Sequence, residues 1–233
     1  MDADTPDSVA LRGTETAAVR AAVADAGATV VERDPDAVVV VGERALLALA
    51  DEPPDVPVLP VADRPRPLTV APADLAAALA GPLARRAHPV LGAHLDGAAV
   101  GRALADVTLV TSESARISEF AVRAGGRRVD DFRADGVVVA TPLGSAGYAR
   151  AAGGPVVEPG TGLAVVPVAE FATFRGAWVL DPPVGCTVER DEVPVSLVLD
   201  GAVVDDVGVG QSLRVVAVDA LDLLVAVDGV ESF

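Results

Sequence analysis

The sequence predicts a small α/β domain followed by a β-rich, sandwich-like domain, and three observations support this. Strand-like and helix-like segments alternate over the first 72 residues, a pattern typical of a parallel sheet covered by helices. The proline-rich stretch Arg64–Pro72, RPRPLTVAP, marks a connector. From Pro89 onwards, short β-like segments separated by Gly and Asp indicate a sandwich. We therefore expect a first domain at residues 1–72 and a second at residues 73–233.

The first domain is expected to begin with a strand at Ser8–Arg12. A helix follows at Thr14–Gly27, where Ala and Val recur at helical spacing, Thr14 or Thr16 serves as the cap and Gly27 ends the helix. The later run AVVVVG is apolar throughout, as is typical of a parallel strand buried on both faces. The remaining elements expected here are strands at Ala28–Glu32, Ala37–Gly42 and Val56–Val61 and a short helix at Glu43–Ala50.

The second domain is expected to open with an Ala- and Leu-rich helix at Ala73–Ala84. Many short strands should follow at close spacing, which favours an all-β architecture. The segments that we expect to be strands include Val90–Leu95, Asp106–Thr111, Ile117–Val122, Val137–Ala140, Ala164–Val168, Ala177–Leu180, Val195–Leu199, Leu213–Val218 and Leu223–Val227.

Charge is the clearest feature of the composition. The net charge is −16, and all 18 Lys and Arg residues are arginines. Such a surface repels itself in dilute buffer and tolerates high salt, where the Debye length is only a few ångströms. The composition therefore predicts a halophilic protein, with GC-rich codon usage and ordinary acidity as the alternative. It argues against a nucleic-acid partner, which would favour a basic stripe.

Other residue types restrict the class of protein further. The single cysteine, Cys186, excludes an internal disulfide framework and suits a reducing cytoplasm. No apolar run approaches the length of a membrane span, and the acidic N-terminus does not resemble a secretory signal. His88 and His94 lack further ligands at metal-binding spacing, so no metal site is expected. Trp178 is expected to lie in the core. These observations predict a cytoplasmic protein with no membrane partner.

The stretch Ala134–Pro155, ADGVVVATPLGSAGYARAAGGP, joins an apolar β-like run to a turn rich in Pro, Gly and Ser. Small residues after a buried strand allow a flat ligand to approach the backbone closely. Tyr148, the only tyrosine in the chain, follows this turn. The stretch resembles the NAD kinase family, whose signature contains Asp-Gly, then Thr-Pro-x-Gly-Ser-x-x-Tyr, then Gly-Gly-Pro.

This resemblance implies dinucleotide-binding roles for part of the stretch. In the family, the acid at the position of Asp135 contacts the nicotinamide end of NAD, usually across a subunit boundary. Ala146 stands where the family has a threonine that supplies a ligand hydroxyl. The positions implied to bind the dinucleotide are Arg133, Asp135, Thr141, Ser145, Ala146 and Tyr148.

The turn Gly42-Glu43-Arg44 is the candidate catalytic segment. A glycine between a parallel strand and a helix is a place where phosphates bind to free backbone N–H groups. The family has Gly-Gly-Asp-Gly-Thr here, and its Asp deprotonates the ribose 2′-hydroxyl. The resemblance therefore implies Glu43 as the catalytic base, with Gly42 and Arg44 beside the nucleotide. By themselves the three residues fit an ordinary strand-to-helix turn equally well.

Two further segments resemble the family. Ala103–Val107 keeps the family's acid as Asp106 but has Ala105 in place of an asparagine that holds the adenosine part of NAD. Arg116 matches a position that contacts the dinucleotide, and an arginine can bond two oxygens of a pyrophosphate. The ordinary alternatives are a surface acid at a strand start and a solvated arginine.

The resemblance implies an ATP- and Mg²⁺-dependent kinase that converts NAD to NADP, with its site in the cleft between the domains. It also implies a homodimer or homotetramer, in which Asp135 serves the site of a neighbouring subunit. The departures from the family pattern gather at the base, the phosphate turn and the adenosine contacts. The alternative is therefore a non-catalytic protein that binds NAD or NADP as a sensor. A different ligand or a purely structural role is the third possibility, and small-molecule nucleotides are the expected partners.

Overall fold

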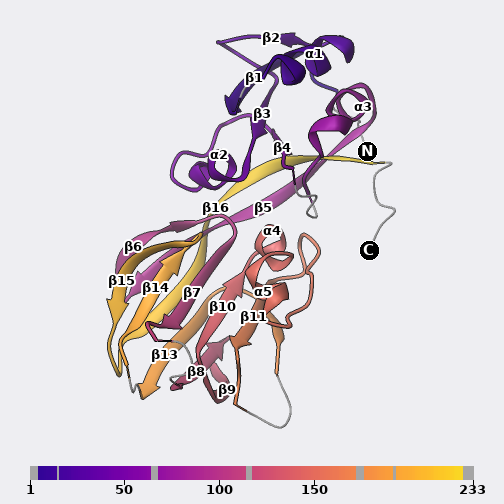
Figure 1. The fold of residues 1–233 in the computed structure, drawn as a ribbon. Helices are drawn as coiled ribbons and strands as arrows, with labels where there is room; N and C mark the ends of the chain where they lie inside the picture. The colour runs from indigo at the N-terminus through magenta and orange to yellow at the C-terminus, as the bar shows by residue number, and fades with distance from the viewer. Residues whose placement is uncertain are drawn as a thin grey trace. The chain divides into compact units, whose positions relative to one another are not determined.

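The computed structural model describes residues 5–14, 16–63, 68–113, 117–171, 176–190 and 193–227. The chain divides into two compact units, residues 1–88 with 220–233 and residues 89–219 (Figure 1). The boundary expected at residue 72 is corrected to residue 88, and the C-terminal segment returns to the first unit. The reason is that two long strands, β5 (Leu83–Leu95) and β16 (Ser212–Ala226), run through both units.

A parallel sheet forms the centre of the first unit, as the alternating pattern predicted. Its strand order is β2-β1-β3-β4-β16, and Leu223 of β16 lies opposite Val58 of β4. The second strand is shorter than expected, with only two residues. The bounds are β1 (Ser8–Gly13), β2 (Thr29–Val30), β3 (Ala37–Val41) and β4 (Val58–Val61).

Short helices accompany this sheet. Helix α1 (Ala17–Asp25) is capped by Thr16, whose Oγ1 accepts a hydrogen bond of 3.2 Å from the backbone N–H of Val19. A single 3-10 turn, η2 (Pro72–Asp74), leads into α3 (Leu75–Ala80). The helix expected to reach Ala84 ends at Ala80 because Gly81 and Pro82 follow, and neither continues a helix. No helix in the described ranges is both long and apolar enough to cross a membrane.

The second unit contains a separate six-stranded antiparallel sheet and the antiparallel half of the ten-stranded sheet to which the parallel strands also belong. The first has the strand order β12-β11-β10-β7-β14-β15. In the second, β16, β13, β8 and β9 are neighbours in that order, and β5 joins β16 to β6. The bounds are β6 (Ala98–Ala103), β7 (Asp106–Thr111), β8 (Ser118–Ala124), β9 (Arg127–Ala134), β10 (Gly136–Ala140), β11 (Leu163–Val168), β12 (Trp178–Leu180), β13 (Val184–Arg190), β14 (Val195–Leu199) and β15 (Ala202–Val207).

The inner faces of these two sheets form one hydrophobic core, which confirms the sandwich. Phe120 of β8 and Phe132 of β9 are fully or almost fully buried, with ring centroids 6.2 Å apart. Trp178 stacks on Phe132 at 5.9 Å and packs against the core, as expected for this residue. Cys186 is buried in the same core.

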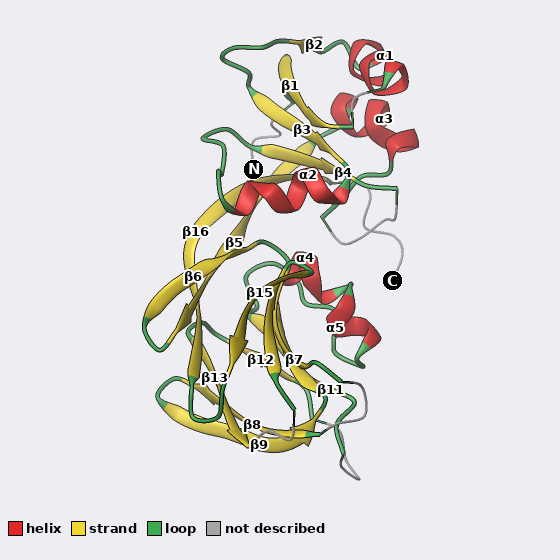
Figure 2. Ribbon diagram, turned by 60° about the vertical axis from the view of Figure 1, so that its left-hand side comes forward, coloured by secondary structure: helices red, strands yellow, loops and turns green. Residues whose placement is uncertain are grey.

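Two short helices cover the other face of the first sheet. They are α4 (Pro142–Ser145) and α5 (Tyr148–Ala151), which Figure 2 shows beside β11. Val138 and Ala140 of β10 pack with Ala149 of α5 in a second, smaller cluster. All five residues of β10 are therefore buried, which explains the apolar run that precedes the turn.

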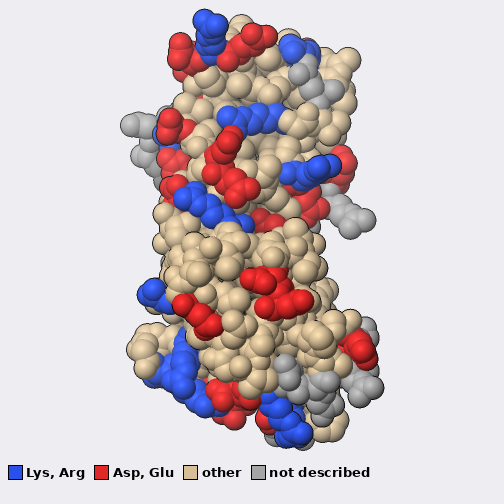
Figure 3. Space-filling view, turned by 90° about the vertical axis from the view of Figure 1, so that its left-hand side faces the viewer, with Lys and Arg blue, Asp and Glu red and all other residues tan. Residues whose placement is uncertain are grey.

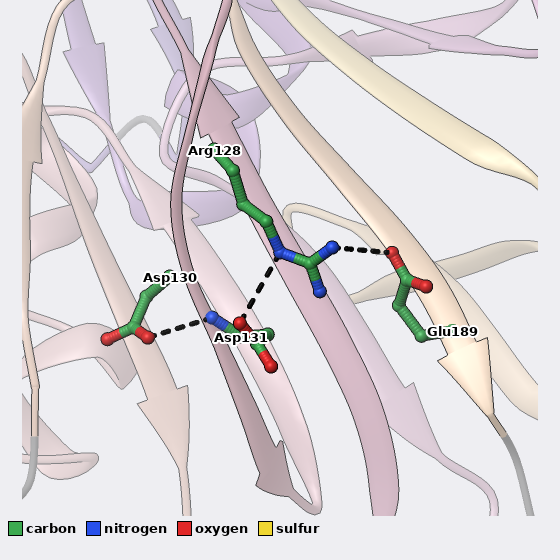
Figure 4. Close-up of polar contacts among 4 residues, drawn as sticks. All are labelled: Arg128, Asp130, Asp131 and Glu189. Atoms are coloured by element: carbon green, nitrogen blue, oxygen red, sulfur yellow. Dashed lines mark hydrogen bonds and ion pairs between the residues drawn. The ribbon is translucent and has the colours of Figure 1, made fainter.

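The surface carries charges of both signs, as one face of the molecule in Figure 3 shows. Around β9, for example, Arg128 lies 3.4 Å from Asp131 of its own strand and 3.7 Å from Glu189 of β13 (Figure 4). These side chains are between 41% and 68% exposed. Because these side chains are exposed, this face of the sandwich is solvated, and ion pairs of this kind contribute little to stability.

Candidate functional site

The first unit has a topological switch point between β1 and β3. The chain leaves β1 through α1 towards β2 on one side, and leaves β3 towards β4 on the other. Ligands of open α/β sheets bind at the carboxyl ends of the strands at such a point. Gly13 ends β1 and Gly42 follows β3, with φ angles of +92° and +97°. The N–H of Thr14 donates to the carbonyl of Val41 at 3.0 Å, which ties the two strand ends together.

The two glycines have different surroundings. A Cβ at Gly13 would overlap the carbonyl oxygen of Val41 and lie 2.7 Å from Cβ of Ala45, so only glycine fits. A Cβ at Gly42 would lie 3.8 Å from Thr14 Oγ1 and, apart from its chain neighbours, would meet no other atom of the described residues within 4 Å. The N–H of Gly42 donates to the carbonyl of Val61 at 2.9 Å, so this N–H is already used within the sheet. Gly13 was not singled out from the sequence, and Thr14 was expected only as a possible helix cap, although a glycine at a strand end was a usable signal.

Glu43 and Arg44 open α2 (Glu43–Leu47), which continues as the 3-10 turn η1 (Ala48–Ala50). Both side chains are exposed, and both follow the switch point directly. The structure therefore places the predicted catalytic segment, Gly42 to Arg44, where an α/β sheet offers a ligand site.

Three predicted residues of the second unit interact electrostatically: Asp106 and Asp135 lie at opposite ends of the β7–β10 pairing, and the charges of both reach Tyr148. Asp106 opens β7, Asp135 immediately precedes β10, and Tyr148 opens α5. Partial burial raises the pKa of the Tyr148 phenol, and the negative charges of Asp106 and Asp135 raise it further. Both carboxylates therefore act electrostatically on this hydroxyl. The tyrosine is 45% exposed, so part of its ring is accessible to a ligand.

Backbone contacts hold both acids at the sheet ends. Asp106 lies opposite Ala140 in the β7–β10 ladder. The N–H of Asp135 donates to Val168 at 2.9 Å, and its carbonyl accepts from the N–H of Thr111 at 2.8 Å. Thr108 donates from Oγ1 to the Asp106 carboxylate at 3.1 Å. These bonds fix the backbone positions from which the two aspartate side chains extend.

Thr141 and Ser145, predicted to bind the dinucleotide, are fully buried and bonded to the backbone. Thr141 Oγ1 donates to the carbonyl of Leu104 at 2.8 Å and accepts from the N–H of Gly144 at 3.2 Å. Ser145 Oγ donates to the carbonyl of Pro142 at 2.7 Å and accepts from the N–H of Val157 at 3.0 Å. In this structure the two hydroxyls therefore hold the turn together. Ala146 is half-buried just after α4.

Arg133 has a charged partner on the neighbouring strand of its own sheet. It pairs across the strands with Glu119, with a bond of 2.8 Å from Nε to the carboxylate, and it is exposed. The hydrogen bond from Arg133 lowers the pKa of Glu119, and the charges of Arg133 and Arg190 add to the effect. The chain passes from one sheet to the other at Ala134, so Arg133 and Asp135 belong to different sheets. Arg116 lies outside the described residues.

Asp200 is not among the predicted site residues, but it bonds directly to the backbone of the segment that leads to Asp106. Its carboxylate accepts hydrogen bonds from three consecutive backbone N–H groups, those of Leu104, Ala105 and Asp106. The sequence signal for the turn was the Asp-Gly pair, which cannot reveal a partner 94 residues away.

No cluster of three or more His, Cys, Asp or Glu side chains that could hold a metal ion occurs in the part of the chain that the structure describes.

Comparison with known proteins gives consistent matches. Residues 104–226 match the sequence model of the ATP-NAD kinase C-terminal domain. The NAD kinase of Methanospirillum hungatei is 31% identical over 184 residues, which cover 73% of this chain and 66% of the relative. The NAD kinase of Methanocorpusculum labreanum is 35% identical over 122 residues, which cover 52% of this chain and 45% of the relative. This chain thus matches only about half to two thirds of the length of these relatives.

Two solved structures share the fold. An NAD kinase from Archaeoglobus fulgidus in complex with ATP superimposes with a TM-score of 0.66 at 20% identity, covering 93% of this chain and 92% of that one. Yeast NADH kinase complexed with NADH gives a TM-score of 0.68 at 18% identity, covering 95% and 84% of the two chains. At these identities the likeness establishes the architecture, an α/β unit joined to a β-rich unit.

Proposed function

Because the chain belongs to the NAD kinase family, we propose that it transfers a phosphate from ATP to the 2′-hydroxyl of NAD and so produces NADP. The observation that carries this proposal is the half-exposed ring of Tyr148 in the second unit, which the charges of Asp106 and Asp135 both reach. Two carboxylates offer acceptors for ribose hydroxyls or a carboxamide, and the exposed part of the tyrosine offers a surface for a flat ring.

Glu43 is the proposed base. It follows the switch point of the first unit, where the family has an aspartate. A base must come within about 3 Å of the hydroxyl proton that it removes, and the extra methylene of glutamate changes this reach. Arg44 is proposed to bind phosphate oxygens, for which its planar guanidinium is well suited.

Mg²⁺ would neutralise charge on the transferred phosphate. This ion is commonly held by one or two carboxylates together with substrate phosphates, so a dedicated protein cage is not required. The residues of this chain would position the two nucleotides, and Glu43 would accept the proton.

The second candidate function is nucleotide binding without phosphoryl transfer. It is favoured by the phosphate turn, where Gly42 donates its N–H to Val61 and Arg44 replaces a glycine. Fewer backbone N–H groups are then left to surround a phosphate, and phosphoryl transfer depends mainly on such positioning.

The deciding experiment is an assay for NADP with NAD, Mg²⁺ and either ATP or polyphosphate in molar KCl. If Glu43 is the base, Glu43→Gln should lower kcat at least about 100-fold. The matched control is Glu52→Gln, the same change at an exposed position of the same unit, which should leave kcat unchanged. Full activity in Glu43→Gln would remove Glu43 from the mechanism.

The melting temperature with saturating NAD, NADP or ATP separates the two functions. A wild-type protein that makes no NADP but melts at a higher temperature with NAD or NADP is a binding protein, since a ligand of the native state raises its stability. In that case Glu43→Asp combined with Arg44→Gly tests whether the turn alone prevents activity. No shift with any nucleotide would refute both functions.

A further inference from the structure

The hairpin between β14 and β15 turns at Asp200 and Gly201. Both residues have positive φ angles, +49° and +83°, which matches the two-residue turn for which Asp-Gly is a preferred pair. The same turn occurs at Asp96 and Gly97 between β5 and β6, with φ angles of +49° and +88°. In each case the aspartate carboxylate accepts hydrogen bonds from one or more backbone N–H groups of another segment.

The carboxylate of Asp200 holds the segment that leads into β7. One oxygen accepts from the N–H of Leu104 at 2.7 Å, and the other accepts from Ala105 at 2.7 Å and Asp106 at 3.0 Å. In return, the N–H of Asp200 donates to the carbonyl of Asp106 at 3.0 Å. Leu104 and Ala105 are buried, so their N–H groups depend on partners within the protein.

Thr141 holds the same segment through its carbonyl groups. Its hydroxyl donates to Leu104 at 2.8 Å and lies 3.1 Å from the carbonyl oxygen of Ala105. The backbone before Asp106 is therefore fixed through its N–H groups by Asp200 and through its carbonyl groups by Thr141. Only the side chain of Asp106 remains to be oriented, and Thr108 bonds to it.

We propose that Asp200 is a positioning residue that holds the carboxylate of Asp106 in place for the dinucleotide. This proposal rests on the proposed function for its ligand, but its geometry does not. An anion is required because three N–H groups converge on the carboxylate. An asparagine has only one acceptor oxygen, and its NH₂ group would face a donor.

The alternative is that Asp200 only stabilises its hairpin. Asp96 is the matched control for that role, because its carboxylate in the same type of turn accepts from the N–H of Ser212 at 2.9 Å. Asp96 is not among the charges that shift the pKa of Tyr148. A purely structural role predicts that Asp200→Asn and Asp96→Asn change stability and nothing else.

Tyr148 supplies a readout that does not need a ligand. It is the only tyrosine, so the absorbance of tyrosinate at rising pH reports this residue alone. The charge of Asp106 raises the Tyr148 pKa, so Asp106→Asn should lower it. If Asp200 holds Asp106, Asp200→Asn should also shift this pKa, but should add nothing in the Asp106→Asn background. Asp96→Asn should leave the titration unchanged.

The test is a double-mutant cycle of Asp106→Asn and Asp200→Asn, read by this titration and by calorimetry with NAD. Asp200→Asn should weaken NAD binding about tenfold in the wild type and less than about twofold in Asp106→Asn. Equal effects in both backgrounds, or an unchanged Tyr148 titration, would overturn the proposal. If the wild type binds no NAD, the proposed function fails, and the titration still decides the role of Asp200. Should Asp200→Asn not fold, Asp200→Glu, which keeps the charge but moves it, is tested by the same two measurements.

Discussion

Gly144 packs directly against the backbone of Ala105. A Cβ at residue 144 would overlap the carbonyl oxygen of Ala105 and lie 2.5 Å from its carbonyl carbon and 3.0 Å from its Cα. Ala105 belongs to the segment before β7 and Gly144 to α4, so the turn that follows β10 is in contact with the start of β7. The glycine of the motif is thus required by packing inside the protein.

Gly144→Ala should therefore lower the free energy of unfolding by about 3 kcal/mol or more, because backbone atoms cannot move aside cheaply. Urea denaturation measures the loss. Gly208→Ala is the control, since the nearest atom there is 3.6 Å away, and it should cost less than about 0.5 kcal/mol. Similar costs for the two variants would contradict the tight contact.

Thr141→Val keeps the side-chain volume but removes a buried hydroxyl with three backbone partners. We expect a loss of about 2–3 kcal/mol, since a carbonyl and an N–H remain buried without partners. Thr161→Val, which removes an exposed hydroxyl bonded to the carbonyl of Glu158, should cost about 0.5 kcal/mol. A stable Thr141→Val that has lost NAD affinity would instead make Thr141 a ligand-binding residue.

The acid dependence of stability should change in Asp96→Asn. The N–H of Ser212 and the side chain of Gln211 donate to Asp96 and lower its pKa below the ordinary value of 3.8. A carboxyl with a lowered native pKa stabilises the fold above its unfolded pKa, and this contribution disappears as the pH falls through the native pKa. The variant should therefore be less stable than the wild type at pH 7, and the difference should shrink below about pH 3.

Urea midpoints at both pH values in molar KCl measure this difference. The control is Asp51→Asn, which removes one negative charge at an exposed position. A difference between Asp96→Asn and the wild type that is independent of pH would contradict the expectation.

Cys186 should be inert in the folded protein. Complete burial raises the pKa of its thiol to about 12, so hardly any reactive thiolate exists at pH 8. Iodoacetamide should alkylate it only after denaturation, as mass spectrometry can show. Because this is the only cysteine, its labelling rate would also report the opening of the sandwich core. Rapid alkylation of the native protein would contradict the burial.

Salt should stabilise the chain. With a net charge of −16, like charges repel at low ionic strength, and the Debye length falls from about 10 Å at 0.1 M to about 3 Å at 1 M salt. We expect the melting temperature to rise by more than about 5 °C over this range of KCl. Sucrose at equal osmolality is the control, because it does not screen charge. An equal rise in sucrose would exclude screening as the cause.

The local pattern predicted much of the fold. Alternating segments indicated the parallel strands β1, β3 and β4, and Thr16 was one of the two caps expected for α1. The motif at Ala134–Pro155 indicated the family. The predictions failed where distant segments decide the structure. Leu83–Leu95 is one strand although it contains Pro89, and the expected pair of strands near the C-terminus is the single strand β16.

The sequence by itself determined the two kinds of architecture and the chemical character of the site, because periodicity, turn residues and motifs are local properties. Only the tertiary structure decided the unit boundary, the burial of Thr141 and Ser145 and the electrostatic interaction of Asp106 and Asp135 with Tyr148. It also decided the contact of Asp200 with a segment more than 90 residues away, from Leu104 to Asp106. The physical reason is that strand register and the partners of buried polar groups depend on which faces the sheets bury against each other. No local pattern contains that information.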